Sequence, residues 1–197
     1  MVGRILAVYS AWCEVAVGDR TFRSLFRGRL KKGQTALVYP GDFVEVEESG
    51  KVMAVKEVLP RKNLLVRPPV ANIDQAIIVT AVTLPPIDPV GLDRLFVHLE
   101  SQDIEGSLCI NKSDLEDPGV IDALREVYLR AGYPVDVTSA VTGDGLKSLR
   151  ERMQGKVSIM AGQSGVGKSK LLTALLGIGL ETAKLARTGR GRHTTKG

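Results

Sequence analysis

The spacing of hydrophobic residues divides this chain into two parts of different character. In the first third, apolar and β-branched residues come in short runs separated by turn residues such as Gly18-Asp19 and Pro40-Gly41. Five or six short antiparallel strands in so small a segment favour an all-β barrel such as an OB-fold, which commonly binds RNA or single strands. The runs that predict these strands are Ile5–Val8, Cys13–Val17, Thr21–Leu25, Ala36–Tyr39, Phe43–Val46 and Val52–Val58.

Beyond residue 67 the pattern changes to alternating strands and helices. We interpret Arg67-Pro68-Pro69 as a linker, because Pro-Pro favours an extended backbone. The apolar run Ala76–Val82 is typical of a strand buried on both faces. Further strands are expected at Ser107–Ile110, Val135–Val137 and Val157–Met160. Such alternation predicts a parallel sheet with flanking helices and with ligands at the carboxyl ends of its strands.

Start signals and apolar stripes locate the helices between these strands. Asp88-Pro89 and Asp117-Pro118 each combine an N-cap with proline at the first helical position. Apolar residues then follow at helical spacing, and two further helices are expected around Leu149 and Leu172. We therefore predict two domains, an OB-fold-like barrel over residues 1–67 and an α/β domain over residues 68–197.

Composition narrows the class of protein only slightly. The 197 residues are 44% hydrophobic and 25% charged, as in ordinary globular proteins. No apolar run approaches the roughly 20 residues needed to span a membrane, so we expect a cytoplasmic protein with no membrane partner. Cys13 and Cys109 lie far apart and outside any CxxC spacing, which argues against a disulfide scaffold or a zinc site.

The charge distribution is more informative than the formal net charge of +5. Residues 1–67 hold 12 Lys and Arg against 7 Asp and Glu, whereas residues 68–197 hold 15 of each. A basic segment from Arg20 to Lys32 contains no acid and is interleaved with Phe22 and Phe26. This pattern favours nucleic-acid contact over a merely solvated strand edge. The residues we expect to contact RNA are Arg23, Arg27, Arg29, Lys31 and Lys32.

A phosphate-binding loop follows the last predicted strand. Residues 162–169 match the pattern G-x-x-x-x-G-K-[ST] at every fixed position. Its glycines let successive backbone N–H groups point at phosphates, and the following helix adds its positive N-terminal end. Lys168 is expected to reach the β- and γ-phosphates, and the Ser169 hydroxyl to ligate Mg²⁺. The predicted nucleotide-binding residues here are Gly162, Gln163, Ser164, Gly165, Val166, Gly167, Lys168, Ser169 and Lys170.

Two further motifs select the base. Asn111-Lys112-Ser113-Asp114 follows one predicted strand, and Thr138-Ser139-Ala140 ends another. The Asp114 carboxylate can accept from the ring N–H and the exocyclic amine of guanine, a donor pair that adenine lacks, and such pairing discriminates strongly. We expect Asn111 to brace the loop, Lys112 to pack on the base, and a backbone N–H at Ser139 or Ala140 to contact the guanine carbonyl.

The set of motifs resembles one GTPase family in particular. N-K-S-D, S-A, G-Q-S-G-V-G-K-S and G-R-G-R-H-T-T are GTPase motifs in circularly permuted order, behind a barrel containing R-G-R-L-K-K and P-G-D-F-V-E-V. This arrangement is similar to the ribosome-small-subunit-dependent GTPases. The resemblance implies a P-loop GTPase domain preceded by an OB-fold, hydrolysis of GTP with Mg²⁺, and a role in late maturation of the small (30S) ribosomal subunit through contacts with rRNA.

The same resemblance assigns roles near the end of the chain. Residues 184–197 correspond to the first switch, where Thr194 or Thr195 would close on Mg²⁺ and His193 is a candidate for orienting the attacking water. Family members continue into a D-x-P-G second switch and a zinc-binding module, so zinc is expected only beyond this chain, which we interpret as truncated. We expect a monomer.

Other functions remain open at this level. The chain could be a nucleotide-dependent RNA-binding module with little hydrolysis of its own. It could also be a P-loop ATPase or kinase, although N-K-S-D argues against an adenine nucleotide.

Overall fold

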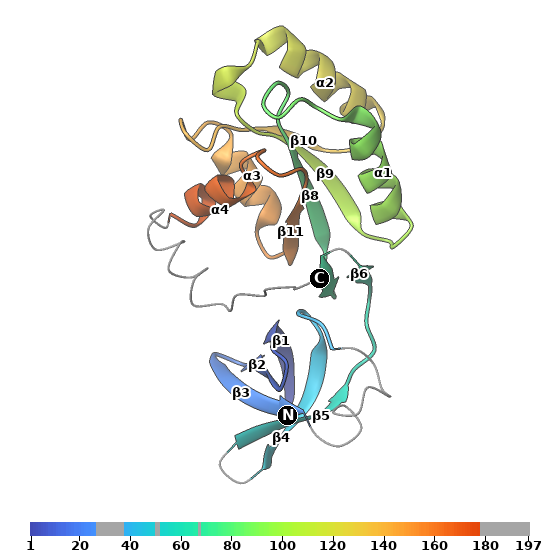
Figure 1. Cartoon of the computed structure of the whole chain (residues 1–197), viewed down its shortest axis with the longest axis vertical. Helices are drawn as coiled ribbons and strands as arrows, with labels where there is room; N and C mark the ends of the chain where they lie inside the picture. Colours follow the sequence, from blue (N-terminus) through green and yellow to red (C-terminus); the bar gives the residue numbers. More distant parts are fainter. Residues whose placement is uncertain (27–37, 50–51, 67, 178–197) are drawn as a thin grey trace, which may run out of the picture. The chain divides into compact units, whose positions relative to one another are not determined.

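The computed structural model describes residues 1–26, 38–49, 52–66 and 68–177. These residues form two compact units (Figure 1). The first comprises Met1–Asp74 with Ser101–Ile104, and the second comprises Gln75–Glu100 with the residues from Glu105 onward. The predicted function of each domain remains a prediction.

Five strands of the first unit close into a barrel. They are β1 (Val2–Val8), β2 (Trp12–Val17), β3 (Arg20–Phe26), β4 (Phe43–Ser49) and β5 (Val52–Val58). The barrel order is β1-β2-β3-β5-β4, in which β3 and β5 pair in parallel and the other pairs are antiparallel. Alternate residues point inward and build an apolar core that includes Ile5, Val15, Val44 and Val55. The small barrel predicted from the sequence is confirmed.

Two segments of the first unit differ from what the sequence predicted or lie partly outside the described residues. The expected strand Ala36–Tyr39 lies mostly outside the described residues, and Val38 and Tyr39 are not in a strand. The linker at Arg67-Pro68-Pro69 is wrong in part, because Pro69 begins β7 (Pro69–Ala71), which pairs antiparallel with β6 (Leu64–Val66). Proline is tolerated at the first residue of a strand because the N–H it lacks is not needed there.

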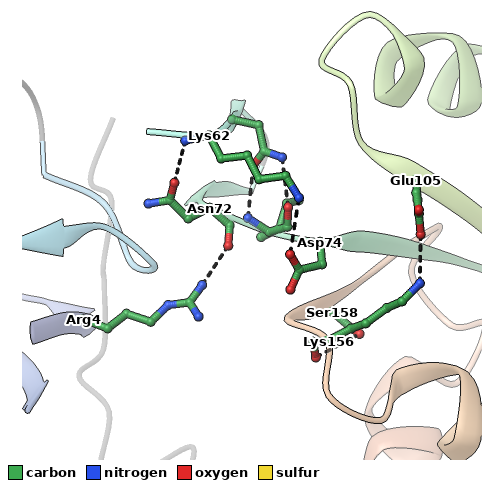
Figure 2. A network of polar contacts seen from close by, with 9 residues as sticks. Arg4, Lys62, Asn72, Asp74, Glu105, Lys156 and Ser158 are labelled. Carbon is green, nitrogen blue, oxygen red and sulfur yellow. Dashed lines mark hydrogen bonds and ion pairs between the residues drawn. The ribbon is translucent and has the colours of Figure 1, made fainter. Parts of the chain in front are cut away.

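A polar network holds this hairpin within the first unit (Figure 2). Arg4 donates to the Asn72 carbonyl at 2.7 Å, and the Asn72 side chain accepts from the Lys62 backbone N–H at 2.7 Å. Lys62 also pairs with Asp74 at 3.4 Å. Arg4 of β1 therefore ties the segment that follows β5 to the barrel, and the pairing of β6 with β7 holds that segment together.

The second unit contains a four-stranded parallel sheet in the order β10-β9-β8-β11. Its strands are β8 (Gln75–Thr80), β9 (Glu105–Ile110), β10 (Val135–Val137) and β11 (Ser158–Ala161). Every residue of β8 is buried, which explains why its four central residues, 76–79, are all apolar. The parallel sheet was predicted and is confirmed.

Helices cover both faces of this sheet (Figure 1). Helices α1 (Pro89–Glu100) and α2 (Pro118–Arg130) lie on one face. Helices α3 (Leu146–Met153) and α4 (Lys168–Leu176) lie on the other, where Leu149, Leu171 and Leu175 pack into the core below the sheet. Among the described residues, no helix combines the length and the apolar character needed to span a bilayer.

The start signals read from the sequence act as expected. The Asp117 side chain accepts from the backbone N–H groups of Gly119 and Val120 at the first turn of α2. Asp88 accepts from Gly91 N at 2.9 Å at the start of α1. Both carboxylates satisfy N–H groups that a helix leaves free at its beginning, so these caps fix where each helix begins.

Candidate nucleotide-binding site

The loop between β11 and α4 has the backbone geometry that a phosphate-binding loop requires. Gly162, Gly165 and Gly167 have φ angles of +135°, +87° and +97°, in the region that favours glycine. At two of these positions a side chain would also clash with neighbouring atoms. A Cβ at Gly162 would lie 2.1 Å from the Val79 carbonyl oxygen, and one at Gly167 would lie 2.5 Å from Asn111 Nδ2. The two glycines let the loop pack directly against β8 and the N-K-S-D segment.

Lys168 begins α4, and its side chain lies back across the loop. Its Nζ donates to the carbonyl oxygens of Gly162 at 2.8 Å and Gln163 at 2.6 Å. Burial lowers the pKa of this ammonium group from its ordinary value. Ser169 and Lys170 are exposed in the first turn of α4. The predicted loop residues therefore surround the positive N-terminal end of α4, where an anion is favoured.

Asn111 joins the motifs of the site and is almost completely buried, with 1% of its surface exposed. Its Nδ2 donates to the Val166 carbonyl of the phosphate loop at 2.8 Å. Its Oδ1 accepts from the Thr138 hydroxyl and from the Ala140 N–H, each at 3.3 Å. One side chain thus connects the end of β9, the end of β10 and the phosphate loop, which is the bracing role expected from the sequence.

Lys112 and Asp114 follow directly. Lys112 has a positive φ of 66°, and its Nζ donates to the Leu84 carbonyl at 2.6 Å. Asp114 is exposed in the short 3₁₀ helix η2 (Ser113–Leu115). Packing of Lys112 on a base and pairing of Asp114 with guanine stay predictions.

The S-A segment forms a tight turn after β10. The Ser139 hydroxyl accepts from the backbone N–H groups of Val141 at 3.2 Å and Thr142 at 3.1 Å. Ser139 N donates to the Asp144 carbonyl at 3.0 Å. These contacts hold the turn beside Asn111, but contact of its backbone with guanine stays a prediction.

Sequence reasoning missed the loop after β8 as part of this site. The Leu84 carbonyl receives the Lys112 ammonium, and Pro85 lies 3.7 Å from the position of a Cβ at Gly165. Glu116 accepts from Thr83 N at 2.7 Å and from the Thr83 hydroxyl at 2.5 Å. The loop is thus attached at two points to the segment that carries N-K-S-D. No local pattern around Thr83 or Leu84 indicates these long-range contacts.

A cavity of about 260 Å³ adjoins the phosphate loop on the side of α1. Gly162 and Gln163 line it together with Thr80, Asp88 and Leu92 among others. Elsewhere in the unit, burial raises the pKa of the Cys109 thiol to about 12, with a hydrogen bond to Thr138 opposing the shift. At neutral pH this cysteine is an apolar core residue and not a nucleophile.

Other predicted residues are distributed between described and undescribed parts of the chain. Arg23 is exposed on β3 of the barrel. His193, Thr194 and Thr195 lie outside the described residues, as do Arg27, Arg29, Lys31 and Lys32. Within the described residues, no group of three His, Cys, Asp or Glu side chains is placed to hold a metal ion. The Ser169 hydroxyl fits Mg²⁺ in another way, because this ion commonly takes few protein ligands and binds the phosphates of the nucleotide.

The arrangement of these motifs defines a class of protein. The N-K-S-D and S-A motifs that follow β9 and β10 precede the phosphate loop after β11 in the chain, yet all three meet at the carboxyl edge of one parallel sheet. That is a P-loop GTPase fold in circularly permuted order. A family model described as RsgA GTPase matches residues 58–197. The chain belongs to this family.

Relatives and solved structures agree. The small ribosomal subunit biogenesis GTPase RsgA of Caldanaerobacter subterraneus subsp. tengcongensis is 42% identical over 98% of this chain and 66% of its own length. That of Shouchella clausii is 47% identical over 88% of this chain and 60% of its own length. The crystal structure of YjeQ from Thermotoga maritima has a TM-score of 0.78 at 37% identity, covering 88% of this chain and 64% of that one. YloQ, described as a circularly permuted GTPase, has a TM-score of 0.74 at 32% identity over 88% of this chain and 63% of that one.

This chain therefore spans about two thirds of the length of these relatives or less.

Proposed function

We propose that this chain is the guanine-nucleotide-binding part of a GTPase that acts in biogenesis of the small ribosomal subunit. The observation that carries the proposal is the set of Asn111 contacts, which join the phosphate loop to both guanine motifs at one edge of the sheet. Relatives named as small ribosomal subunit biogenesis GTPases support hydrolysis over a purely RNA-binding role. Action on ribosomal subunits also supports a cytoplasmic location.

The phosphate side of the site would bind the phosphates and Mg²⁺ and would orient the attacking water. Successive N–H groups of the glycine-rich loop and the N-terminal end of α4 would surround the β-phosphate. Lys168 would exchange its two carbonyl partners for phosphate oxygens, which accept stronger, charge-assisted bonds. Mg²⁺ held by the Ser169 hydroxyl would neutralise charge on the transferred phosphoryl group. His193 would orient the water, and Thr194 or Thr195 would complete the metal site.

The base side of the site would select guanine through Asp114. Asp114 is exposed two residues after Lys112, whose own side chain donates to the Leu84 carbonyl. A carboxylate that accepts two hydrogen bonds from guanine is left unpaired by adenine, and such a mismatch can discriminate by about 10⁴-fold or more.

Displacement of a fluorescent GDP tests this assignment. GDP should displace it far more effectively than ADP does. Asp114→Asn should lose the preference for GDP and gain affinity for xanthosine diphosphate, because the pairing pattern inverts. Asp122→Asn, an exposed aspartate on α2, is the matched control and should leave both affinities unchanged. Equal displacement by GDP and ADP would show that Asp114 does not read the base.

The proposed partner is the small ribosomal subunit, contacted through rRNA by the basic barrel. Adding purified small subunits should raise GTP turnover. Turnover that does not rise at saturating subunit concentration would leave a nucleotide-dependent RNA-binding module. We also propose that the chain is a monomer, which sedimentation analysis would test.

A further inference from the structure

The buried thiol of Cys109 lies close to the side chain that braces the candidate site. Its Sγ is 3.3 Å from the Thr138 hydroxyl oxygen, and that oxygen is 3.3 Å from Asn111 Oδ1. All three side chains are buried. They form a continuous polar chain in the second unit, and buried polar groups of this kind take their hydrogen bonds from one another.

Two backbone groups determine the direction of this chain. The Ala140 N–H can only donate, and Asn111 Oδ1 accepts from it. The Val166 carbonyl can only accept, and Asn111 Nδ2 donates to it. The oxygen of the amide therefore faces Thr138, whose hydroxyl has to donate its one proton there. Only lone pairs of Thr138 are left for Cys109, so the Cys109 S–H is the donor in the last contact.

Burial keeps this proton on the sulfur. It raises the pKa of the Cys109 thiol to about 12, well above neutral pH. An ionised sulfur would attract the Thr138 proton, which is the hydrogen bond that opposes the shift, and Asn111 Oδ1 would lose a donor. The direction of the chain therefore depends on a neutral thiol.

Cys109 also belongs to the apolar core between the sheet and helices α3 and α4. It shares this cluster with Leu149 of α3, Leu171 of α4 and Val166 of the phosphate loop. An alanine or a valine at position 109 could serve such packing. Only a residue with a proton to donate could also serve the Thr138 hydroxyl.

We propose that Cys109 is a positioning residue of the nucleotide site, because its S–H, acting through the Thr138 hydroxyl, helps to hold the Asn111 amide in its working orientation. The proposal rests on the proposed function, since it concerns the brace of the same site. A rotated amide would place Nδ2 against the Ala140 N–H and Oδ1 against the Val166 carbonyl. Both contacts would be repulsive, so the phosphate loop would lose its attachment to the turn after β10.

Release of fluorescent GDP from the full chain tests the role of the thiol proton. Cys109→Ser and Cys109→Ala leave cavities of nearly equal size, but only serine can donate to Thr138. Cys109→Ala should release GDP about threefold faster, because one hydrogen bond of the chain is lost. Cys109→Ser should stay near the parent rate. Equal release from the two variants would mean that Cys109 contributes packing alone, and would overturn the proposal.

Variants of Thr138 test whether the thiol acts through this hydroxyl. Thr138→Val removes the hydroxyl and should release GDP about fivefold faster, whereas Thr138→Ser should release it at nearly the parent rate. Once Thr138 is valine, Cys109→Ala should have no further effect on release, because the thiol no longer reaches Asn111. Additive effects in this double-mutant cycle would overturn the relay.

The S–H stretching band in the infrared spectrum reads the direction of the hydrogen bond. The chain has two cysteines, so Cys13→Ala leaves Cys109 as the only thiol. Its band should lie at the lowered frequency of a donating S–H, and Thr138→Val should move it toward that of a free thiol. A band that Thr138→Val leaves in place would show that the sulfur is not the donor, and would overturn the proposal even if the Cys109 variants fold poorly.

Cys13 is also the matched control for the release experiment. It is a second fully buried thiol, on β2 of the barrel, with its Sγ 3.8 Å from the Ser24 carbonyl oxygen. Cys13→Ala should lower the stability of the barrel, followed in urea at Trp12, the only tryptophan of the chain. GDP release should be unchanged. Faster release from this variant would mean that loss of any buried thiol has the same effect, and would remove the support for a specific role of Cys109.

The outcomes separate this inference from the proposed function. If the parent chain binds GDP in preference to ADP and no Cys109 or Thr138 variant changes GDP release, only the positioning role fails. If the parent chain binds no guanine nucleotide, the proposed function fails and the positioning role fails with it.

Discussion

At the scale of single residues, the phosphate loop requires glycine where a side chain would clash with the neighbouring strand. Gly162 has a positive φ, and a Cβ there would lie 2.1 Å from a backbone oxygen of β8, which cannot move without disturbing the sheet. We expect Gly162→Ala to lower the free energy of unfolding of the second unit by about 3 kcal/mol or more and to abolish GDP binding. Urea unfolding and GDP titration would measure the two effects.

Gly132→Ala separates the clash from the backbone strain. Gly132 also has a positive φ, of +91°, but no atom lies within 4 Å of its Cβ position. This variant should lose only about 1 kcal/mol, the cost of a left-handed conformation for alanine. Similar losses in the two variants would mean that β8 accommodates the added methyl group, and that the close approach to Val79 is not what requires glycine.

At the scale of elements, the clearest predictions came from patterns that are local in the chain. The caps at Asp88 and Asp117 and the apolar run of β8 each reflect physics within a few residues, and the structure agrees with them. The linker prediction at Arg67-Pro68-Pro69 was wrong in part, because an extended backbone suits both a linker and a strand. Whether Pro69 pairs depends on Val66, and nothing at Pro69 itself indicates that partner.

In the candidate site, too, the features set by neighbouring residues could be predicted and those set by distant residues could not. The loop predicted to bind phosphate can be recognised in the sequence, because the backbone conformation of a few consecutive residues determines which residue types it needs. The contact of Lys112 with Leu84 spans 28 positions, and that of Thr83 with Glu116 spans 33. Such contacts arise only once β8 and β9 are side by side, so they are absent from any local pattern.

The attachment of the loop after β8 leads to a prediction for Glu116. Its carboxylate accepts two hydrogen bonds from Thr83 and so positions the segment that follows N-K-S-D. Glu116→Ala should weaken GDP binding about fivefold, equivalent to about 1 kcal/mol, mainly through faster dissociation. Stopped-flow release of fluorescent GDP would measure it.

Glu126→Ala is the control for this experiment. Glu126 is an exposed carboxylate of α2 that pairs with Arg130 one turn further along the helix. Its removal should leave GDP release unchanged. If Thr83→Val shows no coupling to Glu116→Ala in a double-mutant cycle, the hydrogen bonds do not position the loop.

At the scale of the whole molecule, the two compact units have separate cores and separate reporters. Trp12 lies in the barrel, while the phosphate loop and the guanine motifs lie in the second unit. Unfolding of the barrel can therefore be followed by tryptophan fluorescence, and integrity of the second unit by GDP binding. A variant that damages one core should change one signal and not the other.

Asp42 provides that variant. It is fully buried and accepts from Arg61 Nε at 2.6 Å, from a second Arg61 nitrogen at 2.9 Å and from Tyr39 N at 2.8 Å. The pair raises the pKa of Arg61, chiefly through this hydrogen bonding. Asp42→Ala leaves the guanidinium without its carboxylate and should destabilise the barrel by about 3 kcal/mol, as measured by urea unfolding at Trp12.

An exposed ion pair in the barrel serves as the control for Asp42→Ala. Glu45 pairs with Lys56 at 3.4 Å with both side chains largely exposed, so Glu45→Ala should change barrel stability by about 0.5 kcal/mol or less. GDP affinity should be the same in the parent chain and in both variants. If Asp42→Ala weakens GDP binding in parallel with the loss at Trp12, the nucleotide site needs a folded barrel. The barrel would then be able to transmit contact with RNA to the nucleotide site, and the two units could not be treated as separate modules.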